Sequence, residues 1–207
     1  MRREMLGGWC MVASAAMGLV TMALHPTTVA NPALVLAVHA LALAGVPVGL
    51  YGAWVLARRL GEGGPAAELA FAFYTLAAAA TLIAATASGL LAPDVIHHAA
   101  ELQGDARAAA DAVARYNHAV NQAFAKVFVA ASSVAILLWS IEMLRTRLLA
   151  RAAGIVGCVV AALTLLGLLA GHLRMDVHGF GAVVLGQAIW LVMVGLELRR
   201  GRPAAAS

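Results

Sequence analysis

Charged residues are scarce in this chain, and their scarcity excludes most soluble proteins. Only 12% of the 207 residues are charged, whereas 63% are hydrophobic and the mean hydropathy is +0.89. A soluble domain has about a quarter of its residues charged and roughly half of them apolar. A chain of 21.2 kDa could not bury this much apolar surface in a single core. The composition therefore predicts an integral membrane protein that contacts the lipid bilayer.

Cysteine and lysine are also rare. Cys10 and Cys158 both lie inside apolar runs, so the sequence holds no disulfide framework and no cysteine-based metal motif. Lys126 is the one lysine among 14 basic residues, and the net charge is +4. The arginines stand in short groups between apolar runs, where they set membrane orientation. The basic balance therefore does not indicate binding to nucleic acid.

What the sequence does contain is a series of apolar runs. A transmembrane helix needs about 20 predominantly apolar residues. Six runs qualify, at residues 8–24, 33–56, 69–91, 123–144, 152–171 and 179–196. They predict an all-α, polytopic membrane helix bundle with six transmembrane helices. We expect a single transmembrane domain over residues 1–200 and a short cytoplasmic tail over residues 201–207.

The basic residues are divided unequally between the two sides of the predicted bundle. Ten lie on the side that holds both termini: Arg2, Arg3, Arg58, Arg59, Arg145, Arg147, Arg151, Arg199, Arg200 and Arg202. The connections on the opposite side carry only Arg107, Arg115 and Arg174. Since cytoplasmic loops are enriched in basic residues, both termini are predicted to be cytoplasmic. The preference for arginine over lysine and the many alanines are typical of a GC-rich bacterium, which indicates the bacterial inner (plasma) membrane.

The connection between the third and fourth predicted spans is the long one. Pro93 suits the first turn of a helix, and apolar residues then recur at steps of three and four. They are Val95, Ala99, Leu102, Ala106, Ala109 and Val113. This pattern predicts an amphipathic helix over about residues 93–115, lying on the outer membrane surface or capping the bundle.

All seven histidines fall on the outer, periplasmic side of the predicted bundle. Imidazole is a common ligand for transition metals and for haem iron, and polar groups in hydrocarbon are often functional. The residues predict a haem, copper or zinc site in which His39 and His118 approach each other, with further candidates at His172, His178 and His25. The alternative is that these histidines merely occupy the interface as amphipathic residues.

Two further sets of polar residues each allow two interpretations. Asp94, His98 and Glu101 share one face of the predicted outer helix and could bind a divalent ion, although a solvated face would have the same pattern. Gln122 and Lys126 continue a stripe from His118, with Asn121 beside it. We expect this stripe to face the bundle interior as a polar pathway. Alternatively, Lys126 extends its ammonium group to the lipid headgroups.

These observations leave three functions open. The first is redox chemistry or metal handling at an outer histidine cluster, with bound haem or a transition metal. The second is a small transporter that uses the polar stripe. The third is a cofactor-free accessory protein that binds other membrane subunits. No metal or catalytic motif with a diagnostic spacing is present, so the sequence does not decide whether the chain is an enzyme.

The topology can be tested with reporter fusions. Fusions after Arg59 and after Arg147 are expected to report a cytoplasmic position, because both follow arginine-rich connections. A fusion within residues 104–111 is expected to report an external position. An external signal at either arginine would reverse the assignment.

Overall fold

The computed structural model describes residues 2–26, 31–61 and 64–200, and the tail predicted over residues 201–207 lies outside them. The described chain is helical, with short connections. Its elements are α1 (Arg2–Ala23), α2 (Pro32–Leu60), α3 (Ala66–Thr86), the π-helix η2 (Ala87–Leu91), α4 (Ala92–Ala100), α5 (Gly104–Thr146), α6 (Arg151–Leu169) and α7 (Val177–Arg200). Because α3, η2 and α4 follow without a break, they form one long helix.

Six long helices in the described residues are apolar enough to cross a membrane, as the sequence predicts. All six begin before their predicted spans, and four also end beyond them, whereas α1 and α6 end one and two residues short. Large side chains remain exposed on the outside of the bundle, including Leu163, Leu166 and Leu169 of α6. Exposed apolar surface of this kind is expected where a helix contacts lipid.

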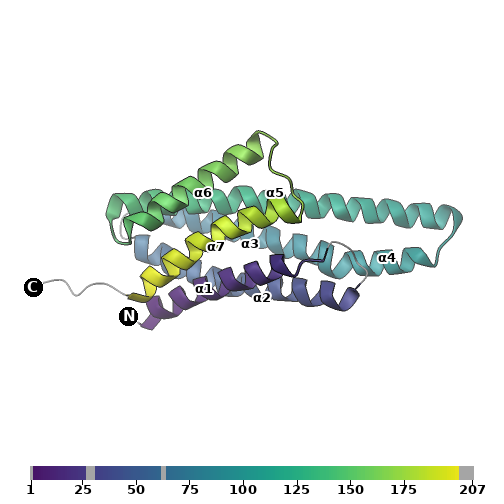
Figure 1. Cartoon of the computed structure of the whole chain (residues 1–207), viewed down its shortest axis with the longest axis horizontal. Helices are drawn as coiled ribbons and strands as arrows, with labels where there is room; N and C mark the ends of the chain where they lie inside the picture. The colour runs from purple at the N-terminus through teal and green to yellow at the C-terminus, as the bar shows by residue number, and fades with distance from the viewer. Residues whose placement is uncertain (1, 27–30, 62–63, 201–207) are drawn as a thin grey trace, which may run out of the picture.

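The helices form one elongated bundle (Figure 1). α1 packs between α2 and α7, while α5 packs against both α3 and α6. The start of α1 and the end of α7 lie together, and we call this the terminal end of the bundle. The opposite end, where α4 and α5 meet, is called the hairpin end. An even number of membrane crossings requires the two ends of the chain to lie on the same side.

The amphipathic helix predicted over residues 93–115 is not confirmed. α4 ends at Ala100, and α5 begins at Gly104, whose φ of +56° is a left-handed conformation that glycine adopts readily. The chain therefore reverses its direction between α4 and α5. Arg107 Nη1 donates a hydrogen bond of 2.9 Å to the carbonyl oxygen of Ala99 across this turn. Sequence periodicity did not reveal this turn, because both arms of the resulting hairpin keep an apolar face.

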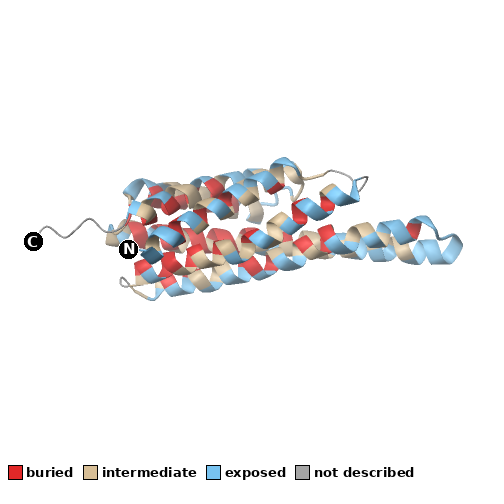
Figure 2. Ribbon diagram, turned by 90° about the horizontal axis from the view of Figure 1, so that it is seen from below, coloured by how far each residue is buried: buried red, intermediate tan, exposed pale blue. Residues whose placement is uncertain are grey.

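The hairpin projects well beyond the rest of the bundle (Figure 1). α5 has 43 residues. At a rise of 1.5 Å per residue it is about 65 Å long, roughly twice the 30 Å hydrocarbon core. Figure 2 shows that the projecting arms are mostly exposed, whereas buried residues follow the bundle toward the terminal end. The structure thus divides into a membrane-sized bundle and a helical hairpin outside it.

Two tryptophans form the centre of the packed core. The indoles of Trp139 and Trp190 stack with ring centroids 6.2 Å apart. The ring of Tyr74 packs against Trp139, with 5.6 Å between the two ring centroids. Trp139 Nε1 donates 3.1 Å to the carbonyl oxygen of Ala67, which lies in the first turn of α3. Both indoles are fully buried, so this cluster fills the interior of the bundle between its middle and the terminal end.

The arginines of the terminal end are held by aromatic and acidic partners. The guanidinium of Arg199 lies 3.6 Å from the ring centroid of Trp9. Arg59 is buried and pairs with Glu4, with 3.6 Å between Nη1 and Oε1. Basic and aromatic side chains therefore gather at this end, as is common at a membrane interface.

Gly157 on α6 offers a direct test of the tryptophan core. A methyl group there would overlap the hydroxyl of Ser140 and the indole nitrogen of Trp190. Gly157→Ala should therefore destabilise the detergent-solubilised protein by about 1–3 kcal/mol, as overpacking does. The control is Gly167→Ala on the same helix, where the nearest atom, Leu173 Cβ, is 3.9 Å away. Equal thermal unfolding midpoints for the two variants would contradict this packing.

Candidate functional site

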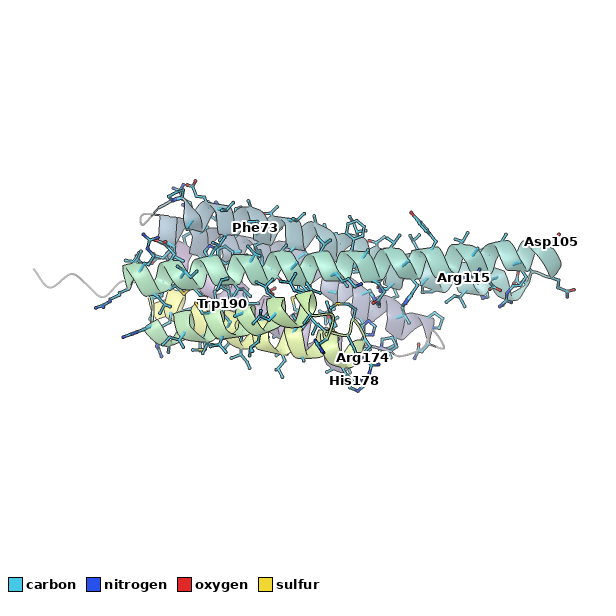
Figure 3. The ribbon with its side chains drawn as sticks, turned by 90° about the horizontal axis from the view of Figure 1, so that it is seen from above. Phe73, Asp105, Arg115, Arg174, His178 and Trp190 are labelled. Carbon is cyan, nitrogen blue, oxygen red and sulfur yellow. The ribbon has the colours of Figure 1, made fainter. Side chains whose placement is uncertain are left out.

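A cavity of about 550 Å³ lies on the hairpin side of the tryptophan core. Four histidines line it, each from a different part of the chain: His25 after α1, His39 on α2, His118 on α5 and His178 on α7. Figure 3 shows His178 lying on the hairpin side of Trp190. The fold therefore brings four of the five histidines proposed from sequence to one cavity.

His39 is the most buried of these histidines, with 4% of its surface exposed. Its Nδ1 lies 2.7 Å from the carbonyl oxygen of Val35, one turn earlier on α2. Because a carbonyl oxygen only accepts, Nδ1 must carry the proton. In the neutral ring this leaves the lone pair on Nε2, and the described residues give Nε2 no hydrogen-bond partner. This tautomer is the one that a metal-binding Nε2 requires.

The π-helix η2 fixes the ring of His39 from the neighbouring helix. Gly89, in the middle of η2, packs so closely that a Cβ atom there would overlap Cβ and Cγ of His39. Asn117 of α5 donates 2.8 Å to the carbonyl oxygen of Ala87 at the start of η2. π-Helical segments inside α-helices occur often at functional sites. Sequence reasoning missed this element, and Gly89 beside Ser88 in an apolar run was its only visible sign.

His25 forms a pair with His39. Their ring centroids are 5.2 Å apart, and the ring planes meet at 66°. Nδ1 of His25 lies 3.1 Å from the carbonyl oxygen of Pro26, so in the neutral ring it too holds its proton on Nδ1. Burial lowers the pKa of His25, and the nearby His39 lowers it further, while the bond to Pro26 opposes both effects. His25 therefore favours the neutral imidazole, which leaves its Nε2 available.

The other walls of the cavity supply polar groups that are already engaged. Gln122 donates 3.3 Å to the carbonyl oxygen of Met175, which ties α5 to the chain before α7. Asp176 Oδ1 accepts a hydrogen bond of 2.8 Å from the amide of Gly179. Asp176 Oδ2 forms an ion pair with Arg174, with 2.7 Å to Nη2. The bond from the Gly179 amide and the Arg174 charge lower the pKa of Asp176. Asn121 also lines this side.

Two methionines form part of the same cavity lining. Met22, on the last turn of α1, and Met175, just before α7, both line the cavity. In the sequence, the polar turn at residues 172–178 already suggests a copper site that uses its histidines and Met175. Met22 stands in an apolar helix and has no distinguishing pattern, so only the fold could show that it lines the same cavity.

A second, smaller cavity of about 170 Å³ adjoins the first. Both are lined by Thr21, Met22, Ala42, Thr81, Phe128 and Phe180. The smaller one reaches toward Gln187, which donates 2.8 Å to the hydroxyl of Ser132. Ile136, a member of the tryptophan core, also lines it. The hollow space therefore extends from the histidines to the packed core.

Several residues proposed from sequence lie elsewhere. His172 is exposed and does not line the cavity, because the turn after α6 places it outside. Asp94, His98 and Glu101 are exposed on α4 and its end, and Nδ1 of His98 bonds to the backbone of Asp94. Across residues 2–26, 31–61 and 64–200, no three His, Cys, Asp or Glu side chains are placed to hold a metal together.

The prediction that Lys126 faces the bundle interior is wrong. Lys126 is exposed and lines neither cavity, although Gln122 does line the larger one. Steps of four residues advance the helix by about 40° each, so Lys126 lies about 80° round from His118. That rotation carries the side chain from the cavity wall to the outer surface of the bundle.

Comparison with known proteins adds no identification: no family model, no curated protein and no solved structure matches the chain.

The protonation of His25 can be tested by NMR of histidine-labelled protein. We expect His25 to titrate below its ordinary pKa of 6.5, because burial disfavours the charged ring. His39→Gln should move the midpoint back toward 6.5, because His39 contributes to the lowering of the His25 pKa. With the folded pKa lowered, this group's contribution to stability is complete above about pH 6.5 and is lost as the pH falls through the folded pKa. A His25 midpoint at or above 6.5 would contradict the buried placement.

Proposed function

We propose that this chain is a membrane protein that binds a transition-metal ion in the histidine-lined cavity. The Nε2 atoms of His25 and His39 are its first ligands. The observation that carries the proposal is their shared arrangement: two adjacent imidazoles both direct Nδ1 to a backbone carbonyl and leave Nε2 available. Metal-binding histidines almost always donate their other ring nitrogen in this way.

The depth of His39 supports a functional role. A polar group in hydrocarbon costs several kcal/mol unless it is satisfied, and a buried imidazole has two nitrogens to satisfy. The Val35 carbonyl satisfies only Nδ1. A metal ion would satisfy Nε2, and the contact with Gly89 already holds the ring in a single position. His118 and His178 line the same cavity, so they can complete the coordination of the ion or accept it from the first two ligands.

The cavity also has the size of an organic cofactor site. Ligand pockets commonly measure about 300–1,000 Å³, and this one measures about 550 Å³. Haem needs one or two axial ligands, which His25 and His39 could supply. Haem is therefore the second candidate ligand, and a visible spectrum separates it from a bare metal ion.

We propose that the site faces the outer side of a bacterial inner membrane. The terminal end carries most of the arginines and is assigned to the cytoplasm by the positive-inside rule. The cavity lies toward the hairpin end and so faces the periplasmic half. The smaller cavity that adjoins this one favours metal handling along a path into the bundle, and Lys126 lines neither cavity.

Metal binding can be measured on the full-length protein in detergent. Elemental analysis and a visible spectrum of the purified protein should give bound metal without a Soret band. His39→Gln and His25→Gln should each weaken binding by at least the 10–100-fold typical of losing a ligand's outer partner. His172→Gln is the matched control, because His172 is exposed outside the cavity.

Three outcomes would contradict the proposal. Unchanged metal affinity in both His39→Gln and His25→Gln would remove these residues as ligands. A Soret band that disappears in His39→Gln would select haem instead. A purified protein that neither retains nor takes up metal or haem would favour the accessory-subunit hypothesis.

A further inference from the structure

The two thioethers in the cavity point to the identity of the metal. Met22 lies three residues before His25, and the amide of His25 donates 3.3 Å to the Met22 carbonyl oxygen. The terminal methyl carbon of Met22 approaches α7 at Gly181, with 3.6 Å to the position a Cβ atom would occupy there. A glycine at this position leaves room for the thioether between the two helices. Met22 thus lies between α1 and α7 and lines the cavity that the histidine pair also lines.

Met175 reaches the cavity from the opposite wall. Its carbonyl oxygen accepts a hydrogen bond from Gln122 of α5, which fixes the backbone of the α6–α7 connection. The next residue, Asp176, begins α7 by accepting from the Gly179 amide. Met175 is therefore anchored at both its own carbonyl and its following residue, and it lines the same cavity as Met22.

The charge of the lining favours an ion of low charge. Asp176 is the only carboxylate that lines the cavity within the described residues. Its oxygens are engaged by Arg174 and the start of α7. The other polar side chains of the lining are imidazoles, thioethers, hydroxyls and amides, none of which supplies a negative charge. The Born cost of moving an ion out of water grows with the square of its charge, so a neutral donor set in a membrane penalises a divalent ion far more than a monovalent one.

Sulfur and nitrogen donors together match one common ion. Soft thioether ligands select Cu(I), whereas carboxylate and water ligands suit hard divalent ions. Cu(I) also accepts low coordination numbers, which two imidazoles and one or two thioethers provide. We propose that the cavity binds Cu(I) through Nε2 of His25 and His39 and the sulfur atoms of Met22 and Met175. This inference rests on the proposed metal-binding function and specifies its metal.

The test compares two metals on the same detergent-solubilised, full-length protein. Cu(I) affinity is measured under reducing conditions by competition with a colorimetric Cu(I) chelator, and Zn(II) affinity is measured in parallel. Met22→Leu and Met175→Leu remove sulfur but nearly conserve volume, so the fold should persist. Each is expected to weaken Cu(I) binding about tenfold or more while leaving Zn(II) binding unchanged.

Met193→Leu is the matched control, because Met193 packs against the tryptophan core and lines neither cavity. It should leave the affinity for both metals unchanged. Thermal unfolding midpoints of the three leucine variants establish that any loss of binding is not a loss of folding. X-ray absorption of the Cu(I)-loaded protein should show both sulfur and nitrogen ligands, with the sulfur contribution reduced in Met22→Leu and Met175→Leu.

The possible failures are distinguishable. Tighter binding of Zn(II) than of Cu(I), or wild-type Cu(I) affinity in both Met22→Leu and Met175→Leu, would overturn the Cu(I) assignment. If His39→Gln still abolished Zn(II) binding, the proposed metal-binding function would stand. Absence of binding for both metals in the wild-type protein would overturn the two proposals together.

Discussion

Wherever this chain crosses hydrocarbon, its backbone must satisfy its own hydrogen bonds. That constraint explains why the membrane-sized part is entirely helical, and it also governs the side chains. The hydroxyls of Thr81 and Ser88 donate to carbonyls one turn earlier on their own helix. His39 does the same with Nδ1. Each of these groups uses its hydrogen-bond donor on a backbone carbonyl of its own helix. Only its acceptor atom is then left for the cavity, and a cation is bound by acceptor atoms.

The bundle has two halves with different physical roles. Between its middle and the terminal end, Trp139, Trp190 and Tyr74 fill the interior. On the hairpin side, small residues such as Ala42, Ala84 and Ala85 line a hollow space. Stability is therefore concentrated away from the cavity. Histidine and methionine side chains can line open space there because the tryptophan core already holds the helices together.

The sequence was sufficient for the coarse fold because hydropathy alone marks a membrane helix. It also predicted that His25, His39, His118 and His178 lie toward one end of the bundle, and these four line one cavity. It did not place them, since the depth of each residue says nothing about its rotation around the helix. His172 and His178 have the same apparent depth, yet only His178 lines the cavity. Lys126 shows the same limit, because the 80° between it and His118 separates a cavity wall from the outer surface.

The π-helix was beyond prediction for a related reason. An extra residue in one turn shifts the phase of everything that follows it on the helix, and apolar composition does not signal the shift. The turn at Gly104 has a similar explanation: an amphipathic pattern is compatible with one surface helix or with two antiparallel arms. In both cases the deciding term is tertiary packing, of Gly89 against His39 and of α4 against α5.

The length of α5 has a mechanical consequence. The helix runs from Gly104 at the projecting tip to Thr146 at the terminal end without a proline or a break. His118, Gln122 and Trp139 are therefore carried on a single rod, which connects the aqueous side, the cavity wall and the tryptophan core. Tilting the tip against the bundle would displace the cavity wall and lever it against the tryptophan stack, because the rod has no joint at which to absorb the motion.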